Sequence, residues 1–166
     1  MPSLAEPNGT HPAGRKAWLR WALLCDEVRT EDNGKHFIIG AYRKAVVLNT
    51  RPALLSLRLT GAFEFVSHGE HKLEFRVTTP GGQGLGAIQS LPDAEPGTYA
   101  DFNVPLVDFL HSDGVIQLDW RVDGDDWGPP MTWQIAFSPD ATDVSEDQAS
   151  AMADVWNSTV AVHSAG

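Results

Sequence analysis

Apolar and polar residues alternate along most of this 166-residue chain, and the clearest run lies between residues 55 and 65. The odd positions of this run hold leucine, glycine or phenylalanine, and the even positions hold serine, arginine, threonine, alanine or glutamate. A period of two sends successive side chains to opposite faces of a strand, so the run predicts a half-buried β-strand. The alternation returns at 71–77, 99–106, 115–122 and 132–137, which predicts an all-β protein.

Turn-forming residues separate these alternating segments. Asn33-Gly34 stands between the apolar segments 18–28 and 35–42, as is typical of a β-hairpin, because both turn residues tolerate positive φ. Shorter strands are expected at 45–48 and 85–90. Eight or nine short strands at this spacing predict a two-sheet antiparallel β-sandwich, Ig-like or jelly-roll-like, with a closed barrel as the alternative.

Both ends of the chain differ from this central β domain, which we place at 15–139. Residues 1–14 contain three prolines and two glycines and predict an extended arm. Residues 140–166 form an acidic tail with no basic residue, in which Ser145 and Gln148 match a capping box. We expect a short helix near 146–156, with Met152 and Trp156 on one face that packs on the sandwich or on a neighbouring subunit.

Charge is unevenly distributed along the chain, whose net charge is −10. Residues 15–58 hold nine basic and four acidic residues, whereas residues 59–166 hold three basic and seventeen acidic ones. These regions either mix on the folded surface or form a basic and an acidic patch suited to head-to-tail contact between copies. The overall acidity argues against a nucleic acid as partner.

Several sequence features bear on the compartment. No apolar run is long enough to span a bilayer, and the first residues lack a basic-then-apolar secretory signal, so we expect no membrane partner. The single cysteine, Cys25, lies in an apolar segment and is expected to be a small buried side chain. These features predict a cytoplasmic protein.

The motifs of catalysis and metal binding do not occur in the sequence. The turn Asp123-Gly124-Asp125-Asp126 departs from the calcium-loop pattern at Trp127 and at Gln134, so we expect a solvated acidic turn, with a non-standard cation site on its three aspartates as the alternative. His68 and His71 are expected to be surface residues of a hairpin turn. There is no nucleophile elbow and no phosphate-binding loop, so no catalytic residue, metal or cofactor is predicted.

Trp127 is the aromatic residue that we expect to be partly exposed. It lies in a loop beside Pro129-Pro130, whereas Trp120 and Trp133 fall on inward positions of their strands. An exposed indole bordered by Asp125 and Asp126 is suited to stacking on a sugar ring or to anchoring a partner.

The N-terminal hairpin carries a family resemblance. The segment Leu23-Leu24-Cys25-Asp26-Glu27-Val28-Arg29, the turn Asn33-Gly34-Lys35 and the continuation Ile38-Ile39-Gly40-Ala41-Tyr42 resemble a family of small uncharacterised bacterial proteins, a domain of unknown function. Gly69-Glu70-His71-Lys72-Leu73-Glu74-Phe75-Arg76-Val77 is similar to the next hairpin of that family. The resemblance covers about residues 20–140 and implies a bacterial or phage origin and a compact β domain, but no catalytic or binding residue.

Three functional hypotheses follow. The first is a non-enzymatic structural or adaptor subunit of a bacterial or phage assembly, which acts through contacts with a protein partner or with itself and is either cytoplasmic or incorporated into a phage particle. The second is a ligand-binding module for a small molecule or glycan at Trp127 and the neighbouring carboxylates. The third, a weaker alternative, is a hydrolase that uses Asp119 and Asp123 as paired carboxylates.

Overall fold

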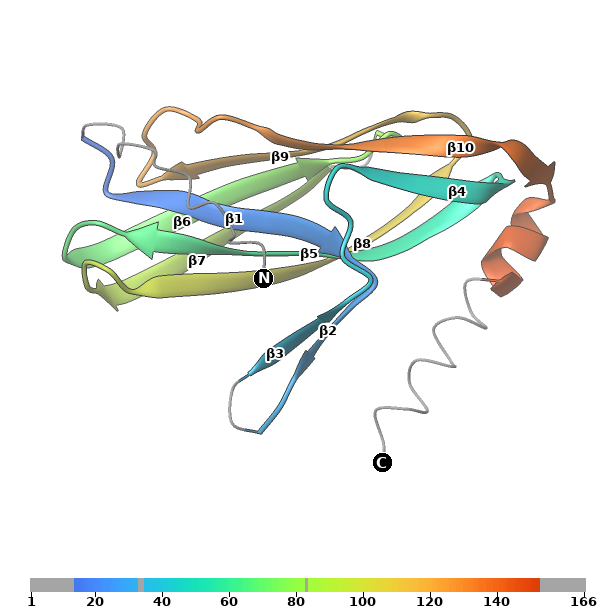
Figure 1. Ribbon diagram of the computed structural model, residues 1–166. Helices are drawn as coiled ribbons and strands as arrows, with labels where there is room; N and C mark the ends of the chain where they lie inside the picture. Colours follow the sequence, from blue (N-terminus) through green and yellow to red (C-terminus); the bar gives the residue numbers. More distant parts are fainter. Residues whose placement is uncertain (1–13, 33–34, 83, 153–166) are drawn as a thin grey trace, which may run out of the picture.

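The computed structural model describes residues 14–32, 35–82 and 84–152, and it is mostly β (Figure 1). Most of the predicted N-terminal arm, the turn Asn33-Gly34 and Trp156 therefore lie outside the described residues. The strands are β1 (Ala17–Cys25), β2 (Glu27–Thr30), β3 (His36–Ile39), β4 (Ala45–Arg51), β5 (Ala53–Phe65), β6 (Gly69–Thr78), β7 (Gly84–Ala94), β8 (Tyr99–Leu110), β9 (Gly114–Val122) and β10 (Met131–Asp143).

The strands form two open sheets and a separate hairpin. One sheet has the order β1-β5-β8, the other has the order β4-β10-β9-β6-β7, and β2 pairs with β3 alone. This arrangement confirms the predicted sandwich, and the described strands form no closed barrel. Among the described strand pairs, β4 and β10 are parallel, and the others are antiparallel.

The core lies between the two large sheets. The odd-numbered residues of β5 from Leu55 to Phe65 are buried, as the alternation predicts. Two aromatic pairs join the sheets: the ring centroids of Phe63 and Trp120 are 5.7 Å apart, and those of Phe75 and Phe102 are 5.4 Å apart. Each such pair stabilises the sandwich by about 0.5–1.5 kcal/mol beyond the area that it buries.

Two strand boundaries differ from the prediction. The single strand expected over 18–28 divides at Asp26 into β1 and β2, so the described residues form ten strands in place of the expected eight or nine. β10 continues past the predicted boundary at Pro139, because Thr142 and Asp143 still pair with β4. The pairing register shifts between Phe137 and Thr142, and such an irregularity accommodates a proline inside a strand.

A short helix follows β10 over residues 146–152 (Figure 1). The predicted capping box is present: the Ser145 amide donates to Gln148 Oε1 over 2.9 Å, and the Gln148 amide donates to Ser145 Oγ over 3.2 Å. Ala149 is buried, whereas Met152 remains 55% exposed. No helix in the described ranges has the length and apolar character needed to cross a bilayer.

Candidate functional site

The β2–β3 hairpin projects away from the sandwich at the point where β1 ends (Figure 1). Its four residue pairs run from Glu27 opposite Ile39 to Thr30 opposite His36. The apolar run Phe37-Ile38-Ile39 lies along β3, where these side chains are 52%, 37% and 42% exposed. Large apolar side chains gathered on one projecting element are typical of a surface that contacts another protein.

Both faces of the hairpin combine apolar and polar groups. Phe37 and Ile39 share one face with an ion pair in which Arg29 Nε lies 2.8 Å from Glu27 Oε1. Ile38 lies on the opposite face, across from Val28. Because three consecutive apolar residues in a strand point to alternating faces, neither face of the hairpin is wholly polar.

A network of three residues holds the base of the hairpin. Tyr42 Oη donates a hydrogen bond to Asp26 Oδ1 over 2.8 Å, and the Tyr42 amide donates to the Leu24 carbonyl over 2.7 Å. Gly40 has a φ of +66°, and a Cβ at this position would lie 1.7 Å from Asp26 Oδ2. Burial and the hydrogen bond to Asp26 raise the pKa of Tyr42 to about 12. The Asp, Gly and Tyr of the hairpin motif therefore position the hairpin.

A second candidate site is a groove of about 580 Å³ on the outer face of the five-stranded sheet. Trp127 lines it and is 39% exposed, as the sequence predicts. The guanidinium carbons of Arg76 and Arg121 each lie 4.8 Å from the Trp127 ring centroid. Asp125 and Asp126 are exposed and are not among the residues that line the groove. In the groove Trp127 is therefore combined with two arginines, and a binding role for Asp125 and Asp126 stays a prediction.

Both arginines are paired with carboxylates. Arg121 Nε bonds to Glu74 Oε2, and this hydrogen bond lowers the pKa of Glu74. Arg76 lies 3.3 Å from Asp119 Oδ2. The alternation along β6 and β9 predicts that Glu74, Arg76 and Arg121 lie on the outer face of the sheet. Their approach to Trp127 depends on contacts between segments distant in the sequence.

His71 is buried, with 2% of its surface exposed, so the expectation of a surface histidine is wrong for this residue. Its Nδ1 lies 2.9 Å from Asp123 Oδ2, and its Nε2 lies 3.1 Å from the Ser67 carbonyl oxygen and 3.3 Å from Ser67 Oγ. Its ring stacks on Phe65 at 5.3 Å. His71 thus joins the β5–β6 turn to the β9–β10 loop.

Asp119 and Asp123, the pair considered for hydrolysis, have separate partners. Asp119 accepts hydrogen bonds from Gln117 and Arg76. Asp123 contacts His71, and Lys16 Nζ lies 3.3 Å away. The residues that the structure describes contain no cluster of three or more His, Cys, Asp or Glu side chains that could hold a metal ion.

Met152 lines a third hollow, of about 240 Å³, beside the C-terminal helix. Val47, Leu48 and Leu54 are among its other lining residues. Drug-sized ligands occupy pockets of about 300–1,000 Å³, so this hollow is small for a ligand. Met152 lies beside these apolar side chains but is 55% exposed, so its predicted packing on the sandwich or on a neighbouring subunit stays a prediction.

Comparisons with known proteins add little on function. No curated protein matches the chain. Among solved structures, a β-glucosidase from Listeria innocua in complex with laminaribiose is 11% identical, with a TM-score of 0.37; the match covers 57% of this chain and 15% of that one. An alkylpurine DNA glycosylase from Pseudomonas fluorescens, bound to DNA with an abasic-site analog, is 10% identical, with a TM-score of 0.37 and coverage of 74% and 31%. The chain thus spans less than a third of either protein, and at these TM-scores neither likeness carries a functional argument.

The family comparison covers most of the β domain. A family described as of unknown function, DUF6941, matches residues 20–129, which include the projecting hairpin, the His71 contacts and Trp127. This match confirms the resemblance seen in the hairpin motif. The chain belongs to the DUF6941 family of unknown function.

Proposed function

We propose that this protein is a non-enzymatic interaction module, a structural or adaptor subunit that contacts a partner protein through its β2–β3 hairpin. The observation that carries the proposal is the exposure of Phe37, Ile38 and Ile39 on an element that projects from the sandwich. Full burial of a large apolar side chain is worth about 1.5–3 kcal/mol, so a partner that covers these three gains appreciable affinity.

The hairpin is also held in place before any contact is made. A two-stranded hairpin is marginally stable by itself in water. The contacts of Tyr42 with Asp26 and with the Leu24 carbonyl fix its base to β1. A preformed binding element loses less conformational entropy on association than a flexible one.

The geometry of the buried polar groups supports a non-enzymatic role. In a serine hydrolase the histidine Nε2 accepts the serine proton. Here Nε2 of His71 lies closer to the Ser67 carbonyl oxygen than to its hydroxyl. Asp119 and Asp123, for their part, are each engaged by a cationic side chain.

Quantitative affinity capture tests the proposal. A Phe37→Ser/Ile38→Ser variant is compared with wild type in the cells that make the protein. The matched control is Tyr99→Ser/Val107→Ser on β8, which removes an aromatic and an aliphatic side chain that are 56% and 54% exposed. We expect to find a partner protein whose captured amount falls about tenfold or more with the hairpin variant and is unchanged with the control variant. Equal recovery with both variants would contradict the proposal.

A further inference from the structure

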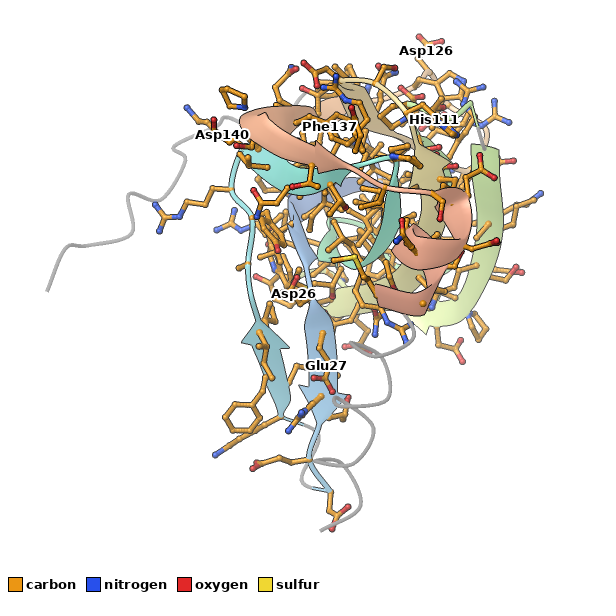
Figure 2. All side chains as sticks on the ribbon, turned by 90° about the vertical axis from the view of Figure 1, so that its right-hand side faces the viewer. Asp26, Glu27, His111, Asp126, Phe137 and Asp140 are labelled. Carbon is orange, nitrogen blue, oxygen red and sulfur yellow. The ribbon has the colours of Figure 1, made fainter. Side chains whose placement is uncertain are left out.

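We propose that the groove beside Trp127 binds a neutral oligosaccharide. Its volume of about 580 Å³ falls within the range of about 300–1,000 Å³ that is typical of small-ligand sites. β6, β7, β9 and the β9–β10 loop all contribute to its lining. Figure 2 shows Asp126, next to Trp127, on the opposite side of the molecule from Glu27 in the hairpin, so this site is separate from the proposed protein contact.

Glycines in the edge strand β7 leave the groove open. Gly84 and Gly86 lie opposite Thr78 and Arg76 of β6 and therefore share a face with them. A Cβ at Gly84 would meet no atom within 4 Å, and one at Gly86 would meet only the Phe75 carbonyl oxygen, at 3.9 Å. Glycine weakens a strand interior and commonly marks a place where a ligand or another backbone approaches closely.

Trp127 supplies the apolar surface of the site. Its ring contacts the guanidinium groups of Arg76 and Arg121 and is 39% exposed. The next residue, Gly128, fixes the loop: its amide donates to the Trp120 carbonyl over 2.7 Å, and a Cβ there would lie 2.3 Å from the Trp120 ring. The part of the indole that the two arginines leave exposed can cover the C–H face of a sugar ring, and a ring already held in position loses little conformational freedom on binding.

The charges in the groove favour a neutral, hydroxyl-rich ligand. The Glu74–Arg121 pair places acceptors beside donors, and each hydroxyl of a sugar both donates and accepts. The negative charge of Asp119 already offsets the positive charge of Arg76. An anionic ligand would have to displace these carboxylates, and a wholly apolar ligand would cover charged groups without replacing their contacts with water.

The test is titration calorimetry of the full chain with neutral hexose oligosaccharides that are first selected on a glycan array. Anionic oligosaccharides and AMP, a small anionic compound that also carries a sugar, are titrated separately as the anionic arms. We expect a neutral oligosaccharide to bind with a Kd on the order of 1 mM or tighter. We expect Trp127→Ala to weaken the affinity for this oligosaccharide by about tenfold or more.

A substitution at a glycine of the groove distinguishes loss of binding through a blocked groove from loss of binding through a damaged fold. Gly86→Leu places a side chain in the groove at a position with room for it, so binding is lost while the far-UV circular dichroism and the thermal midpoint stay at or above wild type. Ser90→Leu is the matched control, because Ser90 lies two positions beyond Ile88 on the same face of β7, outside the groove. Failure of every neutral oligosaccharide to bind, binding confined to the anionic arms, or full retention of binding in Gly86→Leu would overturn the proposal. The state of the hairpin affects none of these outcomes.

Discussion

The Tyr42 hydroxyl donates a hydrogen bond to the Asp26 carboxylate over 2.8 Å at the point where the projecting hairpin leaves the sandwich. The two residues are 16 positions apart and stand on either side of the hairpin. Their hydrogen bond closes the base of the loop, and Figure 2 shows Asp26 at this junction with Glu27 beyond it. The orientation of the exposed residues Phe37, Ile38 and Ile39 depends on this junction.

Gly40→Ala is predicted to break the junction. Its Cβ would overlap Asp26 Oδ2, in addition to the strain of placing alanine at a φ of +66°. Gly97→Ala is the control, because its φ of +81° imposes a similar strain while its Cβ would meet no atom within 4 Å. In urea unfolding we expect Gly40→Ala to lower the free energy of unfolding by about 1–3 kcal/mol more than Gly97→Ala does. Equal losses for the two variants would show that the Asp26 contact contributes nothing.

The pKa of Tyr42 gives a second test of the junction. Burial, followed by the hydrogen bond to Asp26, raises this pKa from 10.0 to about 12. Because the folded-state pKa is raised, the stabilisation is complete below pH 10.0 and is lost as the pH rises through about 12. In a Tyr99→Phe background, tyrosinate absorbance should report a midpoint near pH 12, and Asp26→Asn should lower it only in part, because burial is the larger cause. A midpoint at 10.0 in the folded protein would contradict the structure.

Acid should weaken the contact between His71 and Asp123. Burial works to raise the pKa of Asp123, but hydrogen bonds from His71, the Lys72 amide and Lys16 outweigh it and lower the pKa below 3.8. The stabilisation is therefore present above pH 3.8 and is lost as the pH falls through the lowered pKa. Asp123→Asn suits the test, because asparagine tolerates the φ of 51° at this position.

We expect Asp123→Asn to lower the free energy of unfolding, measured in urea, by about 1–3 kcal/mol near neutral pH. The difference from wild type should shrink at acid pH, where the wild-type carboxylate is protonated. His71→Gln should reproduce this loss at neutral pH, since Asp123 then lacks its imidazole donor. A cost for Asp123→Asn that stays constant from neutral to acid pH would rule out a charged contact.

Cys25 should resist alkylation in the folded protein. The thiol is buried, and burial followed by the charge of Asp26 raises its pKa to about 11. The thiolate is the reactive form, so little of it exists at neutral pH. Iodoacetamide labelling followed by mass spectrometry should be slow in buffer and fast in urea. Fast labelling of the folded protein would show that Cys25 is accessible.

The alternation in the sequence predicts the inner faces of the sandwich because burial of one face requires a period of two. It does not predict the break at Asp26, which depends on the φ of Gly40 and on the Tyr42 hydroxyl. The exposed hairpin residues had a local signal, since Phe37-Ile38-Ile39 interrupts the alternation. The burial of His71 also had a local signal, because residue 71 is in phase with the inward positions 73, 75 and 77 of the same strand. Its contact with Asp123 had none, because that partner lies 52 residues away.

Trp127 likewise combines a property that the local sequence predicts with neighbours that it does not. Its position in a loop beside prolines predicts exposure, and the structure agrees. Its neighbours Arg76 and Arg121 come from β6 and β9, and the pairing of these strands is a long-range feature that local patterns do not encode. The parallel pairing of β4 with β10 is missed for the same reason.

Site-specific photocrosslinking tests the role of the hairpin most directly. A photoreactive phenylalanine analogue replaces Phe37 in one sample and Tyr99, of similar exposure, in the other, in the cells that make the protein. We predict that the probe at position 37 forms a specific adduct with one partner protein or with a second copy of this chain, that the probe at position 99 does not, and that adding Ile38→Ser abolishes the adduct. Equal adduct yields at the two positions, or an adduct at position 37 that Ile38→Ser leaves unchanged, would contradict the hairpin as the contact element.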